Sequence, residues 1–171
     1  MKKTKKLAVS AVLSALGVAL LFLGGLLGVL DISSACIVSF AVLFIYTEVG
    51  WLYAVISYAV ISVLGFILGG TNLFAPFCFL CFFGPMALTK YLFEKTGKVL
   101  SWILKLSAPM LTAFLLRKFL VVFLEIPESI VFELAYYALF FVIIWLTHLL
   151  YISLTRIYMF RYREKIIKFL K

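Results

Sequence analysis

The sequence predicts an all-α membrane protein, with six transmembrane helices in a compact bundle and both termini in the cytoplasm. Of its 171 residues, 66% are hydrophobic and 18% are aromatic, and the mean hydropathy of +1.21 excludes a water-soluble fold. The net charge of +9 comes from cations that cluster at the ends of apolar stretches. Such clusters orient membrane helices and contact anionic lipid, so we expect the bilayer, and no nucleic acid, as a partner.

The first predicted helix covers residues 7–30, which are 24 residues without a charge. At ~1.5 Å per residue this length crosses a hydrocarbon core of about 30 Å. Four lysines precede it and place the N-terminus in the cytoplasm. At 100° per residue, its small residues fall on two separate faces. We call these the alanine face, Ala8, Ala11, Ala15 and Ala19, and the serine–glycine face, Ser10, Ser14, Gly17, Gly24 and Gly28.

Small residues at four-residue spacing allow another helix backbone to approach closely, which is how helices associate in lipid. We expect the serine–glycine face to pack inside the bundle. The alanine face, with Ala11, Ala15 and Ala19, is then available to a partner. The alternative is that both faces pack internally, because alanine is common in membrane helices.

Charges and turn residues set the remaining boundaries. Asp31 and Glu48 flank the second apolar stretch, and the turn at residues 69–72 divides the uncharged stretch that follows. The fourth helix contains Gly84-Pro85, where a kink is expected. A basic tail is expected to continue as a helix along the cytoplasmic interface. As one integral membrane domain, the six helices and the tail cover residues 7–30, 32–47, 49–68, 73–89, 100–124, 129–155 and 156–171.

The distribution of cations supports this topology. Fourteen of the 16 lysines and arginines fall on the predicted inner side, and none falls in an outer loop. The other two, Arg117 and Lys118, lie inside the fifth predicted helix. Because loops rich in lysine and arginine stay in the cytoplasm, this asymmetry favours six spans and cytoplasmic termini.

Arg117 and Lys118 are the first candidates for a binding site. They lie roughly 9–11 Å below the outer end of their helix, where a charge costs several kcal/mol unless it faces a partner or a wet cavity. Snorkelling to the headgroups, or ion pairing with Glu125, Glu128 or Glu133, are the alternatives. A pocket with aromatic walls and a few charges suits a small planar or anionic metabolite. The predicted substrate-binding residues are Asn72, Arg117, Lys118, Glu125, Glu133, Tyr136 and Tyr137.

Nothing in the sequence indicates catalysis, a metal or a cofactor. Cys36, Cys78 and Cys81 lie within apolar stretches and show no disulfide pattern. Cys78 and Cys81 have the spacing of half a zinc site, but no second pair accompanies them. His148 falls in the inner half of its helix, where a buried histidine is the simpler interpretation. Protease, serine-hydrolase and phosphate-loop motifs are missing, so we expect no enzyme.

The lysine-rich start that runs into LAVSAVLSAL at residues 7–16, the six hydrophobic helices and the basic C-terminus resemble the substrate-binding S components of energy-coupling factor (ECF) transporters. In that family an Ala-x-x-x-Ala motif in the first helix contacts the transmembrane T component. Ala11 and Ala15 match this motif, and Ala19 extends it. The resemblance implies uptake of a vitamin or related small metabolite in a bacterial cell membrane, with a T component and ATPase subunits as partners.

Two other functions fit the same layout. One is a non-transporting membrane scaffold of the rod-shape type, in which a small-residue face recruits a partner and no ligand binds. The other is a lipid-handling protein that uses Arg117 and Lys118 on phosphate headgroups. A polar cavity around Arg117 that holds a ligand would distinguish a transporter subunit from a scaffold.

Overall fold

The computed structural model describes residues 3–69, 72–94, 109–115, 117–118 and 130–163, together with positions 103, 107 and 121. These residues form helices and no strands. Two segments are π-helical, η1 (Phe79–Phe83) and η2 (Tyr158–Tyr162). The α-helices are α1 (Lys3–Leu27), α2 (Asp31–Glu48), α3 (Trp51–Leu68), α4 (Phe74–Cys78), α5 (Gly84–Glu94) and α7 (Ile130–Ile157).

Four helical stretches within the described part of the chain are long and apolar enough to cross a membrane. They are Lys3–Leu27, Asp31–Glu48, Trp51–Leu68 and Glu133–Arg161, and Phe74–Lys90 is a shorter apolar helix. The predicted fifth helix lies mostly outside the described residues, although residues 109–115 are helical. The all-helical character and the apolar spans are therefore confirmed. The orientation of the termini stays a prediction.

Two glycines explain where the first helices differ from the predicted ranges. Gly28 adopts φ +66°, which few residues other than glycine tolerate, and its N–H bonds the Gly24 carbonyl at 3.1 Å. Helix α1 therefore ends at Leu27 and not at residue 30. Gly50 has φ +130° and forms the turn before α3, which begins at Trp51 and not at residue 49.

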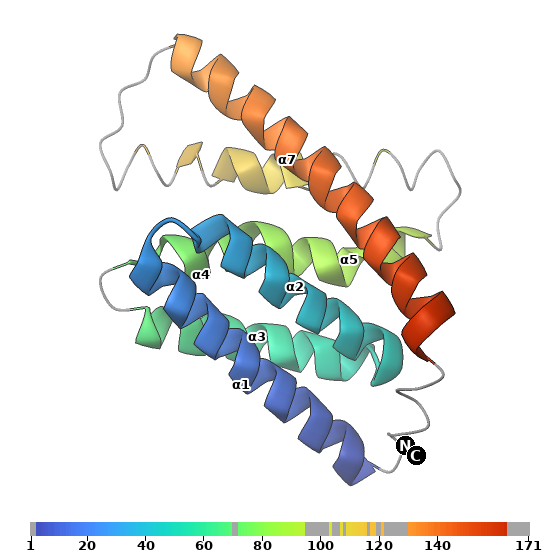
Figure 1. The fold of residues 1–171 in the computed structure, drawn as a ribbon. Coiled ribbons are helices and arrows are strands. Elements are labelled where there is room, and N and C mark those ends of the chain that lie inside the picture. The colour runs from blue at the N-terminus through green and yellow to red at the C-terminus, as the bar shows by residue number, and fades with distance from the viewer. Residues whose placement is uncertain are drawn as a thin grey trace. The chain divides into compact units, whose positions relative to one another are not determined.

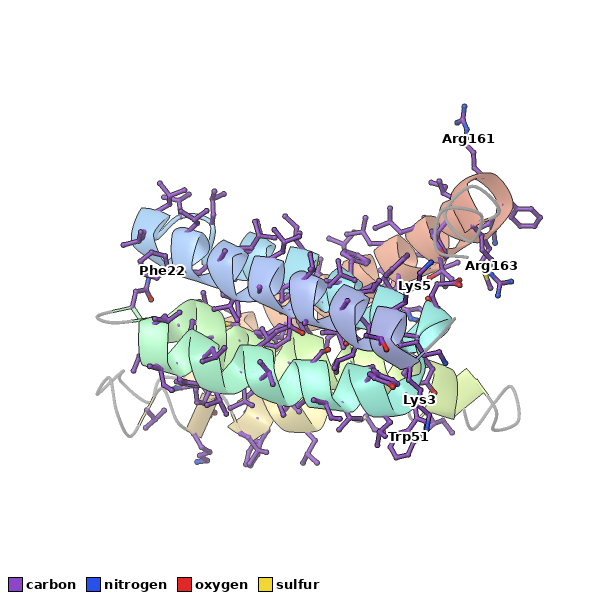
Figure 2. All side chains as sticks on the ribbon, turned by 90° about the horizontal axis from the view of Figure 1, so that it is seen from below. Lys3, Lys5, Phe22, Trp51, Arg161 and Arg163 are labelled. Carbon is purple, nitrogen blue, oxygen red and sulfur yellow. The ribbon has the colours of Figure 1, made fainter. Side chains whose placement is uncertain are left out.

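The chain divides into two compact units, which we call the N-terminal unit (Lys2–Ala108) and the C-terminal unit (Pro109–Lys171). In the N-terminal unit, α1 packs against α2 and α3, and α2 also packs against α4 and α5 (Figure 1). Lys3, Lys5 and Trp51 lie at one end of this unit and Phe22 lies toward the other (Figure 2). The N-terminus of α1 and the turn between α2 and α3 therefore share an end, as antiparallel helices require.

The core of the N-terminal unit consists of aliphatic side chains from α1 to α3 and aromatic side chains from η1. Residues 75–90 are all buried or half-buried, whereas α1 and α3 each leave a wide apolar face exposed. Such exposed apolar faces are expected of helices that contact lipid. Fully buried members of the core are Leu21, Val38, Val42, Ile45, Ile61 and Phe79.

Candidate functional site

The two small-residue faces of α1 have different surroundings. Ser10, Ser14, Gly17 and Gly24 are buried, whereas all four alanines of the alanine face are exposed. Gly28 was predicted to pack with the serine–glycine face, but it is exposed, because α1 ends at Leu27 and Gly28 belongs to the turn that follows. The serine hydroxyls donate to carbonyls of their own helix, Ser10 to Leu7 and Ser14 to Ser10, so their polarity is satisfied without a partner helix.

The glycines of the buried face allow neighbouring helices to lie close to α1. A Cβ atom added to Gly17 would lie 3.1 Å from Val38 of α2 and 3.1 Å from Ile61 of α3. A Cβ atom added to Gly24 would overlap the side chain of Ser34. Only glycine fits at Gly24 without movement of a neighbour, so the serine–glycine face is the internal contact surface of α1.

A polar cluster joins the ends of α1, α2 and α4. The Asn72 Nδ2 group donates to the Gly25 carbonyl at 2.9 Å and to the Asp31 carboxylate at 3.2 and 3.3 Å. The Asn72 Oδ1 atom accepts from the Phe74 N–H at 3.1 Å, which turns the chain into α4. Asp31 is only 8% exposed. We call Asn72, Asp31 and the Gly25 carbonyl the amide–carboxylate cluster.

A second polar contact holds the π-helical segment η1. Here the Gly84 N–H bonds the Phe79 carbonyl, five residues back. In the same register, the donor for the Leu80 carbonyl would be residue 85, which is a proline without an N–H. The Tyr58 hydroxyl of α3 donates to this Leu80 carbonyl at 2.7 Å. Tyr58 thus replaces the donor that Pro85 lacks. Gly84 allows this approach, because a Cβ atom there would overlap the Tyr58 ring.

Removing the Tyr58 hydroxyl tests this interpretation. In Tyr58→Phe the buried Leu80 carbonyl loses its donor, and we expect a loss of about 1–2 kcal/mol in the free energy of unfolding, measured in mixed micelles. Tyr53→Phe on the same helix removes a hydroxyl outside this contact and should change little. In a Pro85→Ala background, residue 85 regains an N–H, so the cost of Tyr58→Phe should shrink. If Tyr58→Phe lowers the free energy of unfolding equally in the wild type and in Pro85→Ala, the Tyr58 hydroxyl does not replace the donor that Pro85 lacks.

The C-terminal unit contains the other predicted site residues that the structure describes. Arg117 is 1% exposed, whereas Lys118 is exposed with its Nζ atom 5.9 Å from the centre of the Phe114 ring. The Tyr136 hydroxyl donates to the Ala113 carbonyl at 3.1 Å. Arg117 is thus a charged residue in a buried position, where charge is costly unless it is compensated.

The aromatic residues of α7 form a contiguous group. The Tyr136 ring lies 5.4 Å from Tyr137 and 4.6 Å from Phe140, measured between ring centres. Glu133, one turn earlier on α7, is half-buried. These side chains fit the predicted aromatic wall, and the Tyr136 bond also gives that tyrosine a packing role.

The predicted substrate-binding residues fall in both units. Asn72 belongs to the N-terminal unit, and its amide is used in the amide–carboxylate cluster. Arg117, Lys118, Glu133, Tyr136 and Tyr137 belong to the C-terminal unit. Glu125 lies outside the described residues. The substrate-binding role of each residue stays a prediction.

Sequence reasoning missed two residues with clear structural roles. Asp31 was read only as a turn residue, although it is the one charge between Lys6 and Glu48, which could have marked it as a residue with a partner. Tyr58 contacts a carbonyl 22 residues away, and no local pattern reports such a contact.

Within the described residues, no group of three or more histidine, cysteine or acidic side chains is placed to hold a metal ion. Cys78 is buried and Cys36 and Cys81 are half-buried, all as free thiols. Comparison of the chain with protein-family models, with curated proteins and with solved structures found no match.

Proposed function

We propose that the chain is the solute-specific binding subunit of an ECF-type ATP-driven importer of a micronutrient, in the bacterial cell membrane. In this proposal both termini are cytoplasmic. The chain binds a small metabolite outside and is energised by a T component and ATPase subunits. It hydrolyses nothing itself.

The contrast between the two faces of α1 is the observation that carries this proposal. Ser10, Ser14, Gly17 and Gly24 of the serine–glycine face are buried, and Gly17 lies close to α2 and α3, so the internal packing of α1 does not use the alanine face. Ala11, Ala15 and Ala19 are exposed and spaced four residues apart. In lipid, such a face favours close contact with a helix of another protein. This matches the surface that S components use to contact their T component.

The buried Arg117 supports the solute-binding part of the proposal. A guanidinium that is 1% exposed in an apolar helical unit requires compensation by carboxylates, dipoles, water or a ligand. Arginine binds carboxylate and phosphate groups through two parallel hydrogen bonds. An anionic metabolite would thus be a fitting ligand for a pocket that includes Arg117, with Tyr136 and Tyr137 as aromatic walls.

The alanine face can be tested by substitution and capture. In Ala15→Leu the added bulk should hold a partner backbone away. We expect the purified variant to remain folded, and to fail to co-purify with a co-expressed T component and its ATPases. Ala11→Leu should behave in the same way. Gly17→Leu is the control on the serine–glycine face. Its main effect should be lower stability of the isolated protein, and not a specific loss of T-component binding. If Ala15→Leu destabilises the isolated protein as strongly as Gly17→Leu, the alanine face is internal packing and the proposal loses its main support.

A further inference from the structure

In the C-terminal unit, α7 continues directly into η2, and together they are longer than the hydrocarbon core of a bilayer is thick. Their apolar stretch, Glu133–Arg161, has 29 residues, or roughly 43 Å at ~1.5 Å per residue, against a core of about 30 Å. The uncharged residues 134–155 alone span about 33 Å, which fits the core with a modest tilt. With residues 134–155 in the core, residues 156–163 would lie at the boundary between the hydrocarbon and the lipid headgroups.

This end of the helix is strongly basic. Arg156, Arg161 and Arg163 are all exposed. In the sequence, the first acidic residue after Glu133 is Glu164, which is followed by Lys165, so residues 156–165 carry a net charge of +3, from four cations and one carboxylate. Figure 2 shows Arg161 and Arg163 pointing away from different sides of the helix end. Cations on more than one side suit a helix that passes through a layer of phosphates and meets headgroups around its circumference.

Apolar side chains accompany these arginines. Ile157 is 50% exposed, Met159 41% and Phe160 89%. A phenylalanine this exposed is unfavourable in water, but aromatic and apolar side chains beside cations are typical of the membrane interface. The backbone remains hydrogen-bonded there, because the Arg163 N–H bonds the Tyr158 carbonyl across η2. The segment can therefore lie next to hydrocarbon without unsatisfied backbone groups.

We propose that residues 156–163 form a binding site for the headgroups of anionic phospholipids. Each guanidinium group binds a phosphate through two parallel hydrogen bonds, and Phe160 inserts beside the acyl chains. A zwitterionic headgroup carries its own ammonium group, which this cluster repels, so the site prefers lipids with net negative charge. This inference does not depend on the proposed transport function.

The test uses the full chain in detergent, titrated with phosphatidylglycerol or phosphatidylcholine and followed by native mass spectrometry. We expect the wild type to bind phosphatidylglycerol at least about tenfold more tightly, since each arginine near such a surface contributes roughly fivefold. The variant R156Q/R161Q/R163Q should bind the two lipids equally. R156K/R161K/R163K keeps the charge and should retain most of the preference. Excess inorganic phosphate should leave the lipid bound.

Three results would overturn the proposal. One is an unchanged preference in R156Q/R161Q/R163Q, checked for helix content and monodisperse elution, or in R161Q alone where the triple variant aggregates. Another is an equal loss in K3Q/K5Q/K6Q, which removes the same charge from the start of α1. That loss would show a response to total charge and not a site in this segment. Displacement by inorganic phosphate would likewise contradict a lipid site.

Discussion

Replacing Gly24 by leucine is expected to lower the free energy of unfolding by about 3 kcal/mol, because a side chain there overlaps Ser34 where α1 meets α2. The loss should appear as reduced stability in mixed micelles, with little folded protein recovered at physiological temperature. Ala19→Leu is the control, since it places the same leucine side chain on the exposed face of the same helix.

A double substitution isolates the cause of this loss. Gly24→Ala introduces only the Cβ atom, and Ser34→Gly removes the side chain that this atom would meet. The pair should be more stable than the sum of the two single effects predicts. Equal stability of Gly24→Leu and Ala19→Leu would mean that the serine–glycine face is not the internal contact surface of α1.

The second large effect is expected at the amide–carboxylate cluster. Asn72→Asp removes the donor to Gly25 and Asp31 and places a second carboxylate beside a mostly buried one. We expect a loss of about 2–3 kcal/mol in unfolding free energy, since the change combines a lost charge-assisted bond with like-charge repulsion. Asn72→Ala removes these donor bonds, and also the acceptor for the Phe74 N–H, but adds no second carboxylate. It should therefore cost less if repulsion is the main cost of Asn72→Asp.

Exchanging the two residues provides the control for Asn72→Asp. In Asp31→Asn with Asn72→Asp, an amide and a carboxylate again face each other, and an acceptor for the Phe74 N–H remains. Stability should recover in part, because the donor to Gly25 depends on the position of the new amide. No recovery in the exchanged pair would show that repulsion between positions 31 and 72 is not the main cost.

The fold could largely be predicted from the sequence because hydrocarbon imposes a simple rule. Backbone groups in lipid must bond within their own helix, so an uncharged stretch of about 20 residues predicts a helix. The two faces of α1 could be predicted for the same reason, since small residues mark where backbones approach. Helix ends depended on the left-handed conformations of Gly28 and Gly50, which a hydropathy pattern does not contain.

The polar contacts could not be predicted in this way. The sequence did not predict that the Asn72 amide bonds Gly25 and Asp31, which lie more than 40 positions earlier, and the role of Asn72 in a pocket stays a prediction. A π-helical segment, Phe79–Phe83, directly precedes Gly84-Pro85, and the Tyr58 hydroxyl bonds its Leu80 carbonyl. Both contacts depend on which helices are neighbours. Sequence spacing predicts on which face of a helix a residue lies, but not which group of another helix it contacts.

The measurement that tests the central claim most directly is native mass spectrometry of the full chain, purified without added ligand. If the chain is a solute-binding subunit, we expect one retained small anionic molecule per chain. Arg117→Ala should bind this molecule about 10- to 100-fold more weakly, as expected for a lost charge-assisted bond, and should still insert into the membrane. The exposed Lys118 should matter less. A wild-type chain that retains no small molecule but still captures a membrane partner through the alanine face would contradict the account and identify a scaffold.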